Sequence, residues 1–218
     1  MCENLKGREQ ALRENLQFPF IYSAVTLIEK KYNFASMQFE CLTTPRLVLR
    51  KLTPEVYDFV FQNYSEDELR SFLGIASEEQ FQNEKDRQEK GRAMYNRDVI
   101  VFQLIDKESQ KVIGSCSLHN WYYLHRRSEL GYAVTDEAFK NKGFMTEAVE
   151  AVIDYGFNQI GLNRIEAFVA PYNTPSRKIM EKFHFKEEGF MKQHYFYDGK
   201  FDDSLVFGLL REEYLVGG

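Results

Sequence analysis

The order of the strand and helix patterns constrains the fold of this chain most strongly. Two apolar runs rich in β-branched residues, 99–105 and 111–118, flank a short polar turn and predict an antiparallel hairpin. A strand pattern at 129–134, an apolar helix pattern at 145–160 and another strand pattern at 164–170 follow. This order predicts an α+β fold, in which helices flank a mixed, mostly antiparallel sheet, and argues against a doubly wound parallel sheet.

Weaker strand and helix patterns lie before residue 99 and after residue 170. A strand is expected at 46–50, followed by helices at 54–64 and 78–92 whose apolar residues recur at helical spacing. A short helix is expected at 176–183. One or two closing strands are expected at 196–210, around a turn at Asp198 and Gly199.

The first part of the chain is expected to be a separate element. Residues 1–36 read as a helical N-terminal extension in two pieces, because Pro19 interrupts the pattern, and residues 37–218 read as one domain. The extension could pack on the domain or on a neighbouring chain, or be a loosely attached arm. The sequence leaves these alternatives open.

Composition restricts the class of protein. The net charge of −5 argues against nucleic acid as the main partner, since phosphate binding needs a basic surface. The three cysteines, Cys2, Cys41 and Cys116, are odd in number and widely spaced, so they form neither a disulfide framework nor a zinc-ligand pattern. There is no apolar run of membrane-spanning length and no apolar stretch typical of a signal peptide. We therefore expect a cytoplasmic protein with no membrane partner.

The junction between the strand at 129–134 and the helix at 145–160 is the most informative segment for chemistry. It reads Lys140-Asn-Lys-Gly-Phe-Met-Thr146. The first N–H groups of a helix lack intrahelical partners and attract anions, and Gly143 permits a positive φ. Lys140 and Lys142 add positive charge. From these residues alone, an ordinary connecting loop is the simpler interpretation, because the P-loop and dinucleotide patterns are absent.

Together with four other segments, this loop resembles the GNAT superfamily of acyl-CoA-dependent N-acyltransferases. The chain looks most like the RimJ/RimL type of ribosomal-protein N-terminal acetyltransferases. The segments that carry the resemblance, which covers roughly residues 37–214, are Thr44–Arg50, Val112–Ser115, Lys140–Ala148, Asn173–Phe185 and Gly199–Asp203. The resemblance implies the GNAT fold, in which two neighbouring strands of the sheet splay apart.

The resemblance also implies where acetyl-CoA would bind. The pyrophosphate loop of the family falls on Lys140, Asn141, Lys142, Gly143, Phe144, Met145 and Thr146. Lys140 lacks the fork of the arginine common at its position, and Met145 is expected to crowd a place usually held by a small residue. Pantetheine would lie between the splayed strands and pair with the backbone of Ala133 and Val134. Asn173 matches a position that contacts the co-substrate, although it could equally be a helix cap.

The implied reaction is direct attack of a primary amine on the thioester of acetyl-CoA, without a metal. Glu129 is the candidate base, acting directly or through a water. The alternative is a surface carboxylate paired with Arg126 or Arg127. Met180 occupies the place of a tyrosine that serves as the acid in many members. Either the thiolate leaves without a side-chain acid, which its pKa near 8.5 allows, or Ser176 or a water assists it.

Two functions follow from this interpretation. The first is an active N-acetyltransferase whose acceptor is a small amine or a protein N-terminus. The second is a GNAT-fold module that binds an acyl-CoA or a partner without turnover, because Met145, Met180 and His184 all depart from the family pattern. The sequence does not identify the acceptor, and it leaves open a monomer or a homodimer.

Overall fold

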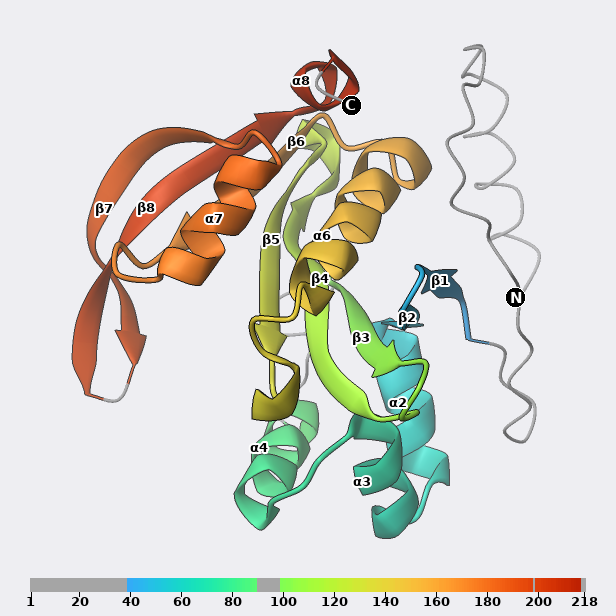
Figure 1. The fold of residues 1–218 in the computed structure, drawn as a ribbon. Helices are drawn as coiled ribbons and strands as arrows, with labels where there is room; N and C mark the ends of the chain where they lie inside the picture. Colours follow the sequence, from blue (N-terminus) through green and yellow to red (C-terminus); the bar gives the residue numbers. More distant parts are fainter. Residues whose placement is uncertain (1–38, 90–98, 198, 217–218) are drawn as a thin grey trace.

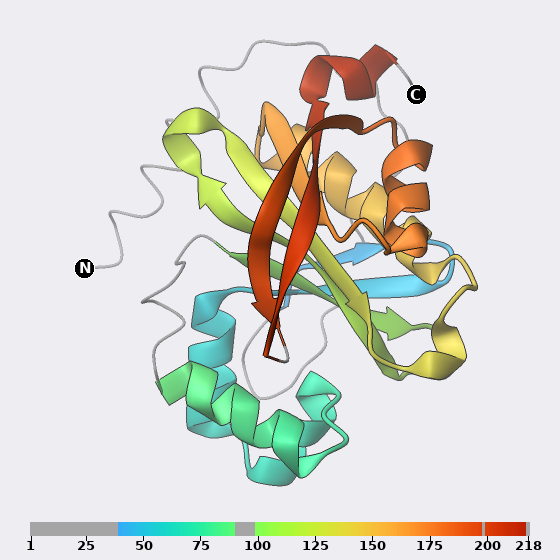
Figure 2. The ribbon, with the colours of Figure 1, turned by 90° about the vertical axis from the view of Figure 1, so that its left-hand side faces the viewer.

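The computed structural model of the chain describes residues 39–89, 99–197 and 199–216. The helical extension predicted for residues 1–36 lies outside these residues. In the described part, helices cover both faces of one twisted sheet, and a long hairpin projects from one side of it (Figures 1 and 2). No helix in the described ranges has the length and apolar character needed to cross a membrane.

The sheet has eight strands in the order β1-β2-β3-β4-β5-β6-β8-β7. All neighbours are antiparallel except β5 and β6, which are parallel. The mixed, mostly antiparallel sheet expected from the sequence is therefore confirmed. The strands are β1 (Cys41–Thr43), β2 (Leu47–Leu52), β3 (Ile100–Asp106), β4 (Val112–Tyr122), β5 (Arg127–Val134), β6 (Arg164–Val169), β7 (Lys186–Tyr197) and β8 (Lys200–Leu210).

The four helices expected after residue 50 are present, and two more appear, over 66–73 and 211–216. The helices are α2 (Pro54–Asn63), α3 (Glu66–Leu73), α4 (Glu78–Glu89), α6 (Phe144–Asp154), α7 (Thr174–Lys182) and α8 (Arg211–Val216). Helix α3, which the apolar pattern did not predict, begins with a capping box between Ser65 and Glu68 and ends at Gly74 with a positive φ. Only two of its residues are buried, so its apolar periodicity is weak.

The apolar helix pattern predicted over 145–160 is not one continuous α-helix. The α-helical part ends at Asp154, and Tyr155–Gln159 form a π-helical turn. Gly156 lies in this turn against the sheet, where an added Cβ would come within 3.2 Å of the side chains of Leu118 and Ile165. The wider turn and the glycine together bring the end of the helix close to the strands.

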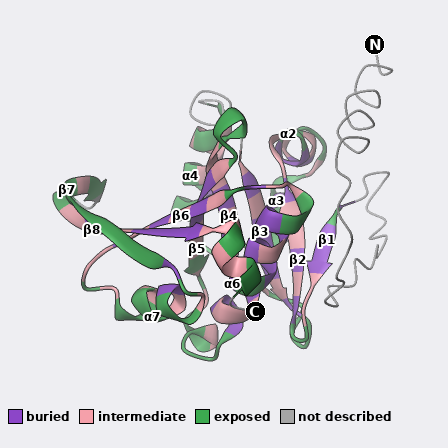
Figure 3. Ribbon diagram, turned by 90° about the horizontal axis from the view of Figure 1, so that it is seen from above, coloured by how far each residue is buried: buried purple, intermediate pink, exposed green. Residues whose placement is uncertain are grey.

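Two apolar clusters lie on opposite faces of the sheet. On one face α6 packs against residues that include Leu47 and Leu49 of β2. On the other face α2, α3 and α4 pack against Leu52 of the same strand. In β2 the residues alternate between buried and half-buried from Leu47 to Arg50, as expected for a strand with two different faces. Figure 3 shows the ribbon coloured by burial. The sheet is therefore covered on both sides, which fixes the positions of the strands that form the site.

Strands β5 and β6 separate after a short paired segment. Their pairing covers Arg127–Glu129 against Arg164–Glu166 only. Beyond Glu129, β5 pairs on its other side with β4, while β6 pairs with β8. The splayed strands implied by the family resemblance are thus present, and the edge of β5 from Leu130 to Val134 has no strand partner on this side within the described chain.

Candidate active site

A cavity of about 290 Å³ lies between the splayed strands. Strands β4, β5, β6 and β7 and helix α7 contribute to its wall. The lining residues are His119, Glu129, Leu130, Gly131, Tyr132, Ala167, Phe168, Val169, Ala170, Asn173, Ser176 and Tyr195. The structure thus brings together three residues that the sequence singled out, Glu129, Ser176 and Asn173. It leaves the predicted loop, 140–146, outside this cavity.

Glu129 is a buried carboxylate held by three donors. Its Oε2 accepts a hydrogen bond from Nδ2 of Asn120 at 2.7 Å, and its Oε1 accepts one from the Tyr195 hydroxyl at 3.1 Å. Nε2 of His119 lies 3.1 Å from the same Oε1. Arg126 and Arg127, the alternative partners considered from the sequence, instead contact the Gly161 carbonyl and Glu166. Glu129 is therefore not a surface ion pair.

The environment of Glu129 keeps it ionised. Burial raises its pKa, but the hydrogen bonds from His119, Asn120 and Tyr195 favour the charged form and outweigh burial, so the pKa lies below its ordinary value. Conversely, burial and the nearby Glu129 charge raise the pKa of Tyr195 to about 12. At neutral pH the site thus presents a fixed negative charge and a protonated phenol.

No sequence pattern indicated that His119 or Tyr195 would be partners of Glu129. His119 and Glu129 are opposite each other in the β4–β5 ladder. The ladder register would have predicted that contact, since directly opposed side chains share one face. Nδ1 of His119 also lies 3.3 Å from the Ser117 hydroxyl. Tyr195 comes from the projecting β7–β8 hairpin, and no local signal in the sequence places it there.

Tyr132 and Ser176 also line the cavity, and their side chains are neighbours. The Tyr132 hydroxyl is buried and makes no hydrogen bond to any described residue. Burial raises the pKa of Tyr132 to about 12, and the neighbouring Ser176 side chain acts in the opposite direction. Asn173 caps α7, because its side chain accepts a hydrogen bond from the Ser176 N–H at 3.2 Å. Helix α7 therefore begins at Thr174, two residues before the start predicted from the sequence.

The loop at 140–146 leads directly into α6. Gly143 precedes the helix with φ 79°, and among the described residues no side chain caps its N-terminus. Lys142 and Gly143 are exposed, whereas the side chain of Phe144 is buried. Lys140 forms an ion pair with Glu137, so its positive charge is partly compensated. The open N–H groups and the left-handed glycine suit an anion such as the diphosphate of coenzyme A.

The three departures from the family pattern do not obstruct these features. Met145 is buried in the core, so its side chain points away from solvent at the loop. Met180 is fully buried in the same core. His184 has φ 60° and lies just past the end of α7. It takes the left-handed position that glycine usually occupies after a helix.

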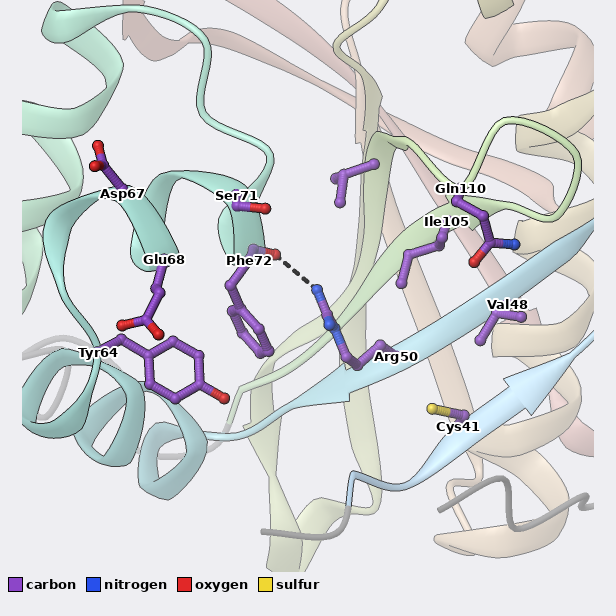
Figure 4. Close-up of a pocket in the computed structure, with 11 residues that line it drawn as sticks. Cys41, Val48, Arg50, Tyr64, Asp67, Glu68, Ser71, Phe72, Ile105 and Gln110 are labelled. Carbon is purple, nitrogen blue, oxygen red and sulfur yellow. Dashed lines mark hydrogen bonds between the residues drawn. The ribbon is translucent and has the colours of Figure 1, made fainter. Parts of the chain in front are cut away.

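A second cavity, of about 440 Å³, lies between α3, with the end of α2, and strands β1–β4 (Figure 4). Its arginine, Arg50, donates to the Phe72 carbonyl at 2.6 Å and to Gln103. Gln103 donates to the same carbonyl at 2.9 Å. These contacts attach the C-terminal end of α3 to the sheet, so the polar groups here have a structural role. Within the described segments, no group of three or more potential metal ligands exists.

Comparisons with known proteins agree with the geometry. Residues 46–186 match the family model described as an acetyltransferase (GNAT) domain. The uncharacterised N-acetyltransferase p20 of Bacillus licheniformis is 36% identical over 182 residues, covering 80% of this chain and 98% of that protein. YdaF of Bacillus subtilis (strain 168), described as a candidate ribosomal N-acetyltransferase, is 35% identical over 101 residues, covering 46% of this chain and 55% of that protein.

A solved structure shows the same fold. The crystal structure of mutant forms of the spermidine/spermine N-acetyltransferase SpeG from Vibrio cholerae superposes with a TM-score of 0.59 at 24% identity, covering 80% of this chain and 99% of that chain. The family model spans more than half of the sequence, and p20 matches over nearly its whole length. The chain therefore belongs to the GNAT acetyltransferase family.

Proposed function

We propose that this N-acetyltransferase moves the acetyl group of acetyl-CoA to a primary amine of a small molecule or a protein N-terminus, with the cavity between β5 and β6 as the reaction site. The observation that carries the proposal is the buried, ionised Glu129 in a cavity between splayed strands. The uncapped N-terminus of α6 supplies the anion-binding amides. The residues present therefore fit coenzyme A, with the loop at 140–146 at its diphosphate and the unpaired edge at Ala133 and Val134 along pantetheine.

When bound, acetyl-CoA supplies an acyl carbon activated as a thioester: the amine nitrogen bonds to this carbon, the carbon–sulfur bond breaks, the nitrogen loses a proton and the thiol leaves with one. The protein positions the amine and manages these two protons. Glu129 and Tyr132 both line the cavity, but they lie three positions apart on β5, so their side chains point to opposite faces of that strand. The two tasks therefore fall to different groups.

Glu129 and His119 serve the amine. The ionised carboxylate attracts the cationic form of an acceptor. It also accepts the proton that the nitrogen loses, directly or through His119 or a water, because nitrogen becomes strongly acidic once it bonds to the acyl carbon. A carboxylate with a low pKa is a weak base for a free ammonium group. At pH 7, deprotonation costs about 1.4 kcal/mol for an α-amine with pKa near 8 and about 4.6 kcal/mol for a lysine-like amine.

Tyr132 and Ser176 serve the departing thiol. A thiol of pKa about 8.5 leaves more readily when a donor stabilises its anion. The Tyr132 hydroxyl is protonated at neutral pH, since burial raises its pKa to about 12 and the neighbouring Ser176 side chain lowers it only in part. It donates no hydrogen bond to a described residue. It can therefore provide the donor that the buried Met180 cannot, and Ser176 provides a second hydroxyl beside it.

The non-catalytic alternative loses its basis in this structure. It rested on Met145, Met180 and His184, and these side chains pack in the core or close a helix. The relatives are named for different amines, a ribosomal acceptor for YdaF and spermidine for SpeG. The RimJ/RimL type, the cytoplasmic location and the monomeric or homodimeric state stay predictions.

The test combines acceptor and donor measurements. The purified chain is incubated with acetyl-CoA and a panel containing spermidine, small primary amines and peptides with free α-amines, while free thiol and product mass are followed. We expect thiol release that depends on the acceptor, with one acetyl group added to its amine. Binding of coenzyme A without acceptor-dependent thiol release for any amine would refute turnover. Absence of coenzyme A binding would refute the site itself.

A further inference from the structure

Arg46 joins three parts of the chain at the start of α6. It lies just before β2, yet its Nη1 donates to the Lys142 carbonyl at 2.9 Å. Its Nε donates to Oε2 of Glu147 at 2.7 Å, and its backbone N–H donates to Oε1 of Glu147 at 2.8 Å. The guanidinium lies over the ring of Phe144, with 4.2 Å between Cζ and the ring centroid. One side chain therefore contacts the loop before Gly143, the first helical residue and the first turn.

The contact with Lys142 fixes the direction of an amide. Across a trans peptide the carbonyl of one residue and the N–H of the next point in opposite directions. Because Arg46 holds the Lys142 carbonyl, the N–H of Gly143 faces away from Arg46. The left-handed conformation of Gly143, φ 79°, and of Asn141, φ 58°, sets the orientation of the neighbouring amides. Such alternation of backbone conformation gathers N–H groups into an anion-binding concavity.

Glu147 in turn holds Arg46 in place. The side chain of Glu147 is 14% exposed, and it accepts hydrogen bonds from the Thr44 hydroxyl as well as from Arg46. Burial raises the pKa of Glu147, but the hydrogen bonds from Thr44 and Arg46 outweigh it and keep the pKa below its ordinary value. The carboxylate is therefore charged at neutral pH and orients the planar fork of the guanidinium.

We infer that Arg46 is a positioning residue for the diphosphate of coenzyme A: it presets the amides of residues 141–146 before the co-substrate binds. The inference rests on the proposed function. The fork geometry is essential to it, because one guanidinium must reach both Glu147 and the Lys142 carbonyl. A lysine carries the same charge but only a single nitrogen at its end, so it cannot bridge these two acceptors in the same way.

The experiment compares Arg46→Lys and Arg46→Ala with the unaltered chain. Calorimetric titration with coenzyme A should show affinity about 10-fold weaker in both variants, the amount expected from losing one or two hydrogen bonds. With the best acceptor of the panel, KM for acetyl-CoA should rise by a similar factor while kcat stays within about twofold. Arg87→Ala, which removes an exposed arginine paired with Glu84 on α4, is the matched control and should change neither quantity.

The outcomes separate this inference from the proposed function. If the unaltered chain fails to bind coenzyme A, the proposed function is wrong. If it binds and Arg46→Lys binds equally well, only charge matters at position 46 and the positioning role is overturned. In the third outcome, kcat and coenzyme A affinity of Arg46→Lys fall equally and its thermal unfolding midpoint is lower. This outcome would show that Arg46 has a purely structural role, and it would also overturn the positioning role.

Discussion

At the scale of single residues, His184 shows how a departure from a family pattern can be a conformational cost rather than a change of chemistry. Its φ is 60°, and two hydrogen bonds close the end of α7: the His184 N–H donates to the Glu181 carbonyl and the Phe185 N–H to the Met180 carbonyl. This is the arrangement in which glycine is normally found. A side chain with a Cβ is strained in the left-handed region.

We therefore expect His184→Gly to stabilise the fold. The free energy of unfolding should rise by about 1 kcal/mol, since removing the Cβ relieves strain of that size. Denaturant titration measures it. Lys178→Gly, in the exposed interior of the same helix, is the control and should lower stability by about 1 kcal/mol. A His184→Gly variant no more stable than the starting chain would mean that the imidazole compensates for the strain.

Tyr132→Phe tests the donor on the thiol side of the cavity. The hydroxyl donates no hydrogen bond to a described residue, and the Ser176 side chain is its polar neighbour, so its removal should leave stability and coenzyme A affinity nearly unchanged. The value of kcat should fall about 10-fold or more, because a proton donor to the leaving thiol is lost. Tyr214→Phe removes a phenol that packs on Phe157, outside the cavity lining, and serves as control. An unchanged kcat would remove Tyr132 from the mechanism.

Glu129→Gln tests the amine side. Because the pKa of Glu129 is held below its ordinary value, the carboxylate does not titrate between about pH 6 and 9. The value of kcat/KM of the variant should therefore be about 100-fold lower than that of the starting chain, and this ratio should be the same at every pH in that range. Steady-state rates over this pH range measure the ratio of kcat/KM between the two chains. Glu150→Gln, on the exposed side of α6, is the control. A pH-dependent ratio of the two rates would contradict an ionised Glu129.

At the scale of elements, the sequence predicts what is local. The apolar patterns of the β3–β4 hairpin and of α6 appear where expected, because side-chain periodicity follows directly from strand and helix geometry. The π-helical turn after Asp154 was not predicted, since it depends on how closely Gly156 approaches the sheet. Candidate residues adjacent in sequence to a motif, such as Glu129 and Asn173, line the cavity.

Residues that reach the site through long-range contacts were missed. Tyr195 is separated from Glu129 by 66 positions, and Arg46 from Glu147 by 101. His119 needed the register of the β4–β5 ladder, which the hairpin pattern alone does not fix to one residue. The chemistry of the site is thus encoded partly in packing between elements, which composition and spacing do not reveal.

The junction of loop and helix gives a prediction at this scale. An added Cβ at Gly143 would have only one described neighbour within 4 Å, the Nη2 of Arg46 at 3.5 Å, so the space there is open. Gly143→Glu should therefore fold but should lose coenzyme A binding by more than about 100-fold, because a negative charge joins a strained backbone beside the diphosphate. Gly143→Ala isolates the backbone strain and should lose less in the same calorimetric titration. Equal affinity for all three chains would place the diphosphate elsewhere.

At the scale of the whole molecule, several carboxylates that join distant segments are held in the charged form. Glu147 links the segment before β2 to α6, Glu129 links β5 to β7, and Glu188 links β7 to Arg164 of β6. The pKa of each lies below its ordinary value: hydrogen bonds outweigh burial for Glu129 and Glu147, and Arg164 lowers the pKa of Glu188. The same charges therefore serve both the site and the cohesion of the sheet.

This arrangement predicts how stability depends on pH. A carboxyl whose pKa is lower in the folded than in the unfolded chain stabilises the fold above the unfolded value, near 4.3, and loses that contribution as pH falls through the folded value. Unfolding midpoints should therefore be nearly constant from pH 7 to 5 and should fall steadily below about pH 4.5. Glu147→Gln should be less stable than the starting chain at pH 7, and the gap should narrow toward pH 3, where both chains carry an uncharged group at that position. A gap that is constant with pH would mean that the carboxylate of Glu147 contributes shape rather than charge to the contact with Arg46.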